Sequence, residues 1–513
     1  MFEIAGAARL IGIETEYGFA SEGVGPHDLL RESAAIVASY AGRSVSCWNY
    51  GAEDPRRDLR GFRVSHLATN PDDAQYDTAS VGAGHAERAD RILENGARLY
   101  NDHGHPEYST PECGSLLDLV AHDRAGEEIV QEAARLRSEA TSRPVRVYKN
   151  NTDYHGASYG THESYLTLRS TEPERLIADL LPFLVTRQIY AGAGKVGVEG
   201  DRGAPPLFQL SQRSDFCAVE ASVDTLHNRP IVNTRDEPHA PPALYRRLHV
   251  IIGDANLSEW ATAIKVGTTC AVLHLIESGW RPSMRVLHPV EAIKRISRDP
   301  TLQWLVHLDD GRVVRATDVQ RHYLEAARRL GDADEEALWL LDEWETALDA
   351  LDRDPSLLRD RVDWVAKRML LEEFLAEEST SWGDPLAQSL DLAYHELDGE
   401  QGLQRGLVAC GAMRRLVSER AVAAARTCPP ANTRAFLRGL FVRRFPAAVK
   451  AVGWSGLAFV HGAEEYWLDM SSLVDGFALR AIEAIGGCTT LDDVVGAMRS
   501  LASAPSAEQG VPR

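Results

Sequence analysis

The stretch "RLYNDHGHPEYSTPEC", residues 98 to 113, concentrates two tyrosines, an aspartate, two histidines and two glutamates in sixteen positions. Gly104 and Pro106 disfavour a helix here, whereas an extended strand ahead of them points alternate side chains to one face, namely Arg98, Tyr100 and Asp102. We expect Gly104 and Pro106 to break the strand and to turn Glu107 back toward the same point. The stretch therefore predicts oxygen ligands that converge from two directions.

Polar side chains also occur in phase on three other strand-like segments. Glu14 and Glu16 in "IGIETEYG" would point to one face, where two carboxylates repel each other unless a cation or hydrogen-bond donors lie between them. A solvent-facing strand edge is the alternative for this pair. Each of the other two segments carries one such pair, His162 with Ser164 and Arg247 with His249. Four segments of this kind in one chain indicate a shared site.

The residue types in this set indicate the ligand class. Hard oxygen ligands favour Mg²⁺ over zinc, which prefers cysteine or more histidine. One guanidinium group can bind two phosphate oxygens at once. The chain offers four arginines for this purpose, Arg98, Arg213, Arg235 and Arg247. The combination predicts a polyphosphate bound with Mg²⁺. We therefore assign Glu16, together with Glu14, to the metal, and Arg213 to the nucleotide.

The order of patterns along the chain predicts an α+β fold rather than a doubly wound parallel sheet. Strand-like alternation covers residues 9 to 20, 146 to 151, 159 to 170 and 246 to 254, and helical spacing dominates residues 318 to 380. We predict three parts: a large catalytic domain over residues 1 to 435 with a mobile loop at 51 to 78, a small C-terminal domain at 436 to 501, and a disordered tail at 502 to 513.

Bulk composition excludes several classes of protein. No apolar run in the 513 residues approaches the ~18 to 20 residues needed to span a bilayer, so we expect no membrane segment. The formal net charge of −20 opposes binding to nucleic acid. Seven cysteines without a C-x-x-C pair are typical of reduced thiols, which predicts a cytoplasmic protein.

The charge is distributed unevenly. Residues 331 to 400 carry 21 Asp and Glu against 5 Lys and Arg, whereas residues 401 to 450 carry 10 Lys and Arg against the single Glu419. The basic segment either faces an acidic partner or pairs with the acidic segment before it. The sequence does not separate these two alternatives.

Eight strings of the sequence, which contain the candidate site residues named above, resemble the family of Pup ligases and Pup deamidase/depupylases. They are "GIETEYG", "NGARLYNDHGHPEYSTPEC", "YKNNTD", "GASYGTHESYL", "PFLVTRQ", "QLSQRSD", "NTRDEPHA" and "YRRLHVIIGDANLSE". The similarity extends from about residue 10 to residue 460. It implies a glutamine synthetase-like fold, in which a curved antiparallel sheet packed with helices cradles ATP and Mg²⁺. It also implies that the partner is Pup or a related small protein modifier.

The resemblance implies roles for individual residues. Asp102 would be the catalytic carboxylate, either as nucleophile or as a general base that activates water. Mg²⁺ would be bound by Glu14, Tyr100, Glu107, His162 and His249. ATP would contact Arg98, Thr110, Ser164, Arg247 and Trp454. Ser164 stands where the family more often has asparagine, and Trp454 is equally expected in the core of the C-terminal domain.

Members of this family catalyse opposite reactions. The ligase phosphorylates the C-terminal glutamate of Pup and joins it to a lysine, whereas the deamidase hydrolyses a C-terminal glutamine amide and cleaves Pup from lysines. The five-residue step from Asp102 to Glu107, the loop containing "DPRRDLRGF" and the chain length resemble the deamidase. We therefore expect an ATP- and Mg²⁺-dependent amidohydrolase that acts on Pup and pupylated proteins. The alternatives are the ligase, an inactive nucleotide-binding scaffold and a small-molecule carboxylate-amine ligase.

Overall fold

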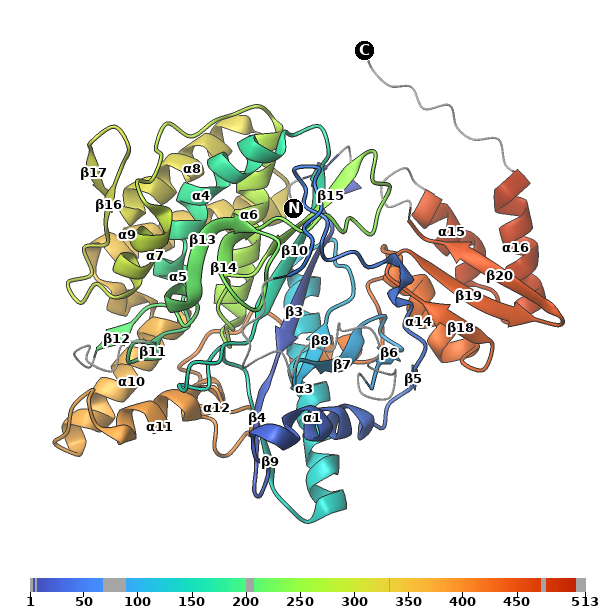
Figure 1. The fold of residues 1–513 in the computed structure, drawn as a ribbon, viewed down its shortest axis with the longest axis horizontal. Helices are drawn as coiled ribbons and strands as arrows, with labels where there is room; N and C mark the ends of the chain where they lie inside the picture. Colours follow the sequence, from blue (N-terminus) through green and yellow to red (C-terminus); the bar gives the residue numbers. More distant parts are fainter. Residues whose placement is uncertain are drawn as a thin grey trace.

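The computed structural model describes residues 3 to 4, 7 to 67, 89 to 199, 207 to 331, 333 to 471 and 477 to 503. A nine-stranded sheet forms its centre (Figure 1), in the order β13 (Cys217–Ser222), β14 (Arg229–Asn233), β15 (Tyr245–Val250), β10 (Thr161–Leu168), β3 (Ile11–Glu16), β8 (His105–Ser109), β7 (Arg98–Asp102), β6 (Arg91–Leu93), β5 (Ser44–Val45). Neighbouring strands are antiparallel except β13 and β14, which are parallel. The expected α+β class with a mostly antiparallel sheet is confirmed.

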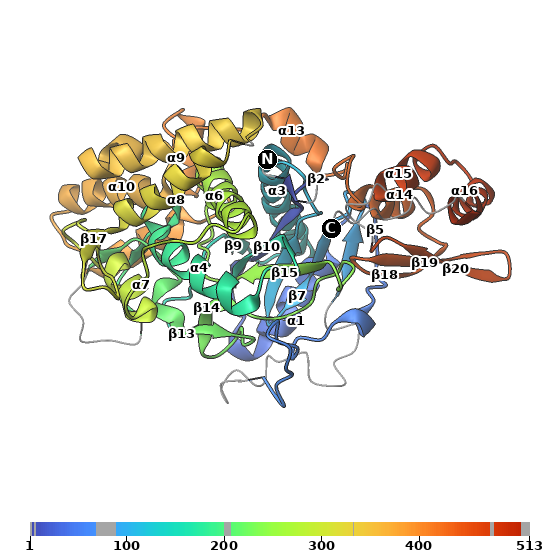
Figure 2. The ribbon, with the colours of Figure 1, turned by 90° about the horizontal axis from the view of Figure 1, so that it is seen from above.

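The apolar face of the sheet is covered by helices (Figure 2). Ile11 and Ile13 of β3 share a core with apolar residues of α3 and α6, including Leu119 and Trp260. The helices of this part are α1 (Leu29–Ala38), α3 (Leu116–Thr141), α4 (Pro173–Thr186), α5 (Gln188–Ala191), α6 (Glu259–Glu277), α7 (Pro289–Ser297), α8 (Ala316–Leu330), α9 (Glu335–Arg353), α10 (Asp363–Glu377), α11 (Pro385–Tyr394), α12 (Leu403–Ala409) and α13 (Glu419–Ala425). The helical spacing over residues 318 to 380 corresponds to α8, α9 and α10.

Short strands pair outside the main sheet. These pairs are β1 (Glu3–Ile4) with β2 (Ala7–Ala8), β4 (Gly18–Ser21) with β9 (Val145–Tyr148), β11 (Lys195–Val196) with β12 (Phe208–Gln209), and β16 (Leu305–His307) with β17 (Val313–Arg315). The alternation over residues 9 to 20 therefore serves two sheets, because the chain leaves the main sheet after Glu16 and continues in β4.

The C-terminal part forms a second unit beside the main sheet (Figure 1). It consists of α14 (Ala435–Arg444), a three-stranded sheet of β18 (Val449–Val452), β19 (Gly456–His461) and β20 (Glu464–Asp469), then α15 (Phe477–Gly486) and α16 (Leu491–Ser503). Its core also contains Trp48 and Ile92 from the N-terminal half. The boundary at residue 435 stays a prediction. Helix α16 extends two residues past the predicted domain end at 501, and tail residues 504 to 513 lie outside the described residues.

The first part of the predicted loop at 51 to 78 is attached to the end of β14. Leu59 is buried in the main core, and its N–H donates to the Thr234 carbonyl oxygen at 2.8 Å. The Thr234 hydroxyl donates to Oδ2 of Asp58 at 2.6 Å. Residues 68 to 78 lie outside the described residues, so the mobility of the loop stays a prediction.

Arginines of the basic segment are paired with acidic residues of the body. Nη1 of Arg414 lies 3.0 Å from Oε1 of Glu343 in the acidic segment, and Nε of Arg415 lies 3.2 Å from Oε1 of Glu259. The structure favours the pairing alternative at Arg414, whose partner belongs to the acidic segment, whereas Arg415 pairs with a carboxylate outside that segment.

Two further sequence expectations concern membranes and cysteines. In the described part of the chain, every helix is too short or too polar to cross a bilayer. All seven cysteines are free thiols.

A buried ion pair stabilises strand β10 on the face opposite His162. Glu163 lies on the opposite face of β10 from His162, and its carboxylate accepts hydrogen bonds from Arg187 at 2.6 and 2.8 Å. Burial alone would raise the pKa of Glu163, but Arg187 outweighs it and the pKa is lowered. The pair therefore fixes the strand to the segment that follows α4.

Replacing Glu163 with glutamine should destabilise the protein by about 3 to 5 kcal/mol, because Arg187 would remain as an uncompensated buried charge. Denaturant unfolding followed by tryptophan fluorescence measures this change. The matched control is Glu345→Gln, which removes an exposed ion pair with Arg328 and should cost less than ~1 kcal/mol. Equal effects of the two substitutions would contradict the prediction.

Candidate active site

One face of the sheet carries polar side chains from five adjacent strands, β7, β8, β3, β10 and β15. Cross-strand partners in an antiparallel pair share a face. The register pairs Glu14 with His162 and with Ser109, Glu16 with Glu107, Tyr100 with Glu107, and Ser164 with His249. The convergence expected from the sequence is therefore produced by strand register.

Strands β7 and β8 form a hairpin around a loop of two residues, His103 and Gly104. Their φ angles are 46° and 85°, and positive values at both positions are what a type I′ turn requires. Asp102 and His105 close the loop as a direct pair. Asp102 therefore ends its strand at the edge of the polar face.

Pro106 does not break the strand, so that expectation was wrong. Pro106 pairs with Asn101 inside the hairpin, and its carbonyl oxygen accepts a hydrogen bond from the Tyr17 N–H at 2.9 Å. Proline removes only its own N–H, and the carbonyl continues the ladder. Glu107 reaches the site because it pairs with Tyr100 across the hairpin.

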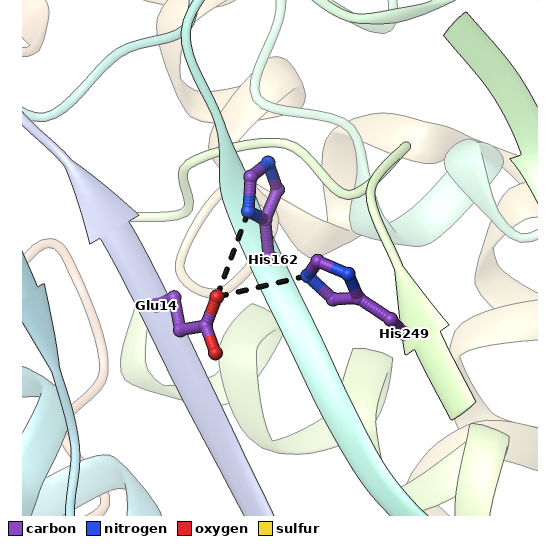
Figure 3. A group of neighbouring side chains, drawn as sticks. All are labelled: Glu14, His162 and His249. Carbon is purple, nitrogen blue, oxygen red and sulfur yellow. Dashed lines mark ion pairs between the residues drawn. The ribbon is translucent and has the colours of Figure 1, made fainter. Parts of the chain in front are cut away.

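The first candidate metal group is Glu14, His162 and His249, from three adjacent strands (Figure 3). Oε2 of Glu14 lies 3.8 Å from Nδ1 of His162 and 3.6 Å from Nε2 of His249. Burial would raise the pKa of Glu14, but the two imidazoles and Arg247 lower it well below its usual range. Burial and Arg247 lower the pKa of His249 to about 3, which leaves its imidazole neutral.

The second candidate group is Glu16, Asp102 and Glu107, whose carboxylate oxygens lie within 4.8 Å of one another. Burial and then the charges of Asp102 and Glu16 raise the pKa of Glu107 well above its usual range. Burial and the charge of Glu107 likewise raise the pKa of Tyr100. The predicted metal ligands thus lie on one face but in two neighbouring groups, which the strand carrying Glu14 and Glu16 connects.

These donors fit divalent cations. Both ring nitrogens of His249 are buried and have no hydrogen-bond partner among the described residues, which is costly for a neutral imidazole. The second group offers only oxygen donors, the ligands that Mg²⁺ prefers, whereas imidazoles are more common ligands of transition metals. Mg²⁺ is therefore best matched by the second group.

A cavity opens on the same face beside the first metal group. Its lining includes four residues assigned to the nucleotide, Thr110, Ser164, Arg247 and Trp454, together with Glu14. Nη1 of Arg247 lies 3.2 Å from both Oε1 of Glu14 and Oγ of Ser164. Gly12 also lines the cavity, where an added Cβ would lie 3.5 Å from Oγ1 of Thr110.

Two other arginines assigned to the nucleotide lie outside the cavity lining. Arg98 forms an ion pair with Asp90 at 2.7 Å, and its guanidinium carbon lies 3.8 Å from the centre of the Tyr100 ring. Arg213 donates to the Ile251 carbonyl oxygen at 2.8 Å and to Oγ of Ser158 at 2.6 Å. Protein groups therefore hold both guanidinium groups, and their contact with nucleotide stays a prediction.

Trp454 combines its two expected placements. It lines the cavity, and it also packs at the edge of the C-terminal core, 5.1 Å between ring centres from Trp48. The guanidinium carbon of Arg438 lies 4.8 Å from the centre of its ring. The C-terminal unit thus supplies one wall of the cavity.

The lining residues to which sequence reasoning gave no role include Glu112, His239 and Arg434. Arg434 and Arg438 both bind the Glu112 carboxylate, at 2.5 Å each. Burial would raise the pKa of Glu112, but the two arginines lower it to about 2. The four-residue spacing of these arginines, which places them on one helix face, was a signal for a shared anionic partner.

Comparisons with known proteins identify the family of the chain. Residues 9 to 458 match the family model of Pup-ligase proteins. A depupylase from Acidothermus cellulolyticus is 45% identical over 464 residues, which cover 88% of this chain and 91% of the relative. A Pup–protein ligase from Acidimicrobium ferrooxidans is 42% identical over 450 residues, covering 85% of this chain and 89% of the relative.

Two solved structures are also similar. The complex between Pup and its ligase PafA has a TM-score of 0.75 and 30% identity, covering 99% of this chain and 98% of the ligase. The ligase PafA in complex with ADP has a TM-score of 0.71 and 31% identity, covering 86% of this chain and 96% of the ligase. Both the sequence match and the structural match extend over most of the chain. The chain therefore belongs to the Pup ligase family.

Proposed function

We propose that the chain is an ATP- and Mg²⁺-dependent amidohydrolase, which deamidates the C-terminal glutamine of Pup and cleaves Pup from lysine side chains. The observation that carries the proposal is the carboxylate of Asp102, which lies at a strand end within an acidic group on the polar face of the sheet. The depupylase relative supports the reaction, and the ligase solved with ADP supports the use of a nucleotide. The free cysteines support a place in the cytoplasm.

The reaction adds one water to the amide and releases ammonia, or a lysine amine in depupylation. The carboxylate of Asp102 either attacks the amide carbonyl carbon or takes the proton from an attacking water, and both roles need an ionised, fixed carboxylate. Mg²⁺ bound by Glu16, Glu107 and Tyr100 would supply positive charge for the developing oxyanion and for nucleotide phosphates. Glu14, His162 and His249 would hold a second cation next to the cavity, which is also Mg²⁺ when Mg²⁺ is the divalent ion supplied.

The ligase is the alternative activity, because the ligase relative is nearly as similar as the depupylase. The hairpin loop favours the hydrolase. Its two residues match the deamidase-type spacing between Asp102 and Glu107, whereas the ligase type carries one more residue there. That extra residue would lengthen the loop and move the carboxylate relative to Glu107.

Incubation with ATP, Mg²⁺ and Pup ending in glutamine or in glutamate tests the proposal. We expect conversion of the glutamine form to the glutamate form with release of ammonia, measured by mass spectrometry and an ammonia assay. Conjugation of the glutamate form to an acceptor lysine, without deamidation, would establish the ligase activity instead.

Asp102→Asn is the control for this assay. It should lower kcat by about 10² to 10⁴-fold because an amide is neither nucleophile nor base, while nucleotide binding stays unchanged. Asp310→Asn, in the exposed turn between β16 and β17, is the matched substitution and should leave kcat unchanged. An active Asp102→Asn variant would refute the assignment.

Glu14→Gln should raise the Mg²⁺ concentration for half-maximal nucleotide binding at least about tenfold, because a neutral amide is a weaker ligand than a carboxylate. Titration with a fluorescent ATP analogue at fixed nucleotide and variable Mg²⁺ measures it. Glu220→Gln, on the exposed edge strand β13 of the same sheet, is the control. An unchanged Mg²⁺ requirement would exclude Glu14 as a ligand.

Gly12→Val should weaken nucleotide binding at least about tenfold, because its side chain would fill the cavity floor beside Thr110. The thermal midpoint should stay close to wild type, since valine suits a strand. Gly406→Val, where an added side chain meets open space, is the control. Wild-type affinity in Gly12→Val would place the nucleotide elsewhere.

A further inference from the structure

The hairpin loop of the site contains a contact to which the proposed reaction assigns no role. Nδ1 of His103 lies 2.7 Å from Oδ2 of Asp102, the residue before it in the chain. His103 adopts a φ of 46°, a conformation that histidine, like asparagine and aspartate, tolerates better than most residues other than glycine. The turn therefore admits an imidazole at this position, in contact with the carboxylate of Asp102.

Electrostatic repulsion between carboxylates gives the contact between His103 and Asp102 a role. Three carboxylates, Glu16, Asp102 and Glu107, lie within reach of one ion and repel each other when ionised. Glu16 is buried and accepts a hydrogen bond from the Gly160 N–H at 2.8 Å. Glu107 is buried too and is hydrogen-bonded to Tyr100.

Asp102 is the member of this group that packing restrains least. Its side chain is 26% exposed, whereas Glu16 and Glu107 are buried residues. A short, partly exposed carboxylate beside two like charges lowers its energy by turning toward water. The hydrogen bond from His103 opposes this rotation.

The backbone beneath the imidazole is anchored on both sides. An added Cβ on Gly104 would lie 3.5 Å from Cβ of Leu29, so the turn rests against the first residue of α1. The ring of His105 stacks on Tyr159 with 4.4 Å between ring centres. The loop therefore presents the His103 ring from a fixed base.

We propose that His103 is a positioning residue, whose Nδ1–H donates to Oδ2 of Asp102 and holds the carboxylate toward the substrate amide. The inference rests on the proposed function, in which Asp102 acts on that amide. A hydrogen bond to a charged acceptor is strong enough to select one side-chain orientation against weakly screened repulsion. His103 contributes orientation and does not itself touch the substrate.

Three substitutions at position 103 test the hydrogen bond without disturbing the turn. Asparagine, aspartate and glycine all tolerate a positive φ, and Asn-Gly, Asp-Gly and Gly-Gly are favoured in two-residue hairpin loops. Only asparagine places an N–H donor where Nδ1 of the imidazole lies. Aspartate has the same shape but offers a charged acceptor, and glycine offers neither group.

In the deamidation assay, His103→Asn should keep kcat within about threefold of wild type, while His103→Gly should lower it about 10- to 100-fold. His103→Asp should lower kcat at least as much as His103→Gly, because it adds a fourth negative charge. KM for the glutamine form of Pup and the thermal midpoints should stay close to wild type in all three variants, since the turn and the docking surface are unchanged.

Wild-type kcat in His103→Gly or in His103→Asp would overturn the proposal. An equal loss in His103→Asn and His103→Gly would also overturn it, because the donor at this atom would then not matter. The Asp102→Asn variant separates this inference from the proposed function. If Asp102→Asn is active, the proposed function fails. If Asp102→Asn is inactive and His103→Gly is fully active, only the role of His103 fails.

Discussion

The repulsion between carboxylates on one sheet face is the constraint on which the rest of the site depends. Antiparallel pairing places Glu16 directly beside Glu107, and the hairpin adds Asp102 to the same group. The shared negative charge raises the pKa of the buried Glu107. On the same central strand, imidazoles and Arg247 lower the pKa of Glu14. Strand β3 thus carries Glu16 in an acidic group and, two residues earlier, Glu14 in a group whose charge is neutralised.

The opposite face of the sheet makes this arrangement mechanically possible. Apolar side chains of the strands pack on α3 and α6. The buried charged groups on this side of the sheet form ion pairs with each other instead of contacting water. Lys149, just after β9, bridges Asp123 and Glu127 of α3 at 2.6 and 2.8 Å. Removing either partner of such a pair is costly, and the pair of Glu163 with Arg187 stabilises β10, one of the strands that carry the candidate ligands.

The C-terminal unit contributes to the site through arginine contacts with Glu112 and through Trp454. Arg434, the residue before α14, and Arg438 of α14 bind the carboxylate of Glu112, and Trp454 of the second unit lines the cavity. Trp48 and Ile92 of the first unit lie in the C-terminal core. Because one unit supplies a cavity wall and the other supplies the candidate metal ligands, the proposed nucleotide site needs both units docked.

Local sequence alone determined which residues share a face. The two-residue period of Glu14 with Glu16, and of Tyr100 with Asp102, predicted their common direction, because side chains alternate strictly along a strand. The α+β class followed in the same way from periods along the chain. The pairing of a glutamate with histidines 148 and 235 residues away was not readable from the period, because strand order is set by long-range packing.

Tertiary structure alone decided how these faces combine. Strand register divided the expected metal ligands into two groups, and neighbouring protein groups engaged Arg98 and Arg213, which the sequence had assigned to the nucleotide. The role of Pro106 also depended on tertiary structure, because its carbonyl oxygen accepts a hydrogen bond from a residue on another segment. Side-chain direction depends on the residue's own backbone, whereas a ligand set depends on which other backbones lie alongside it, and only folding brings those together.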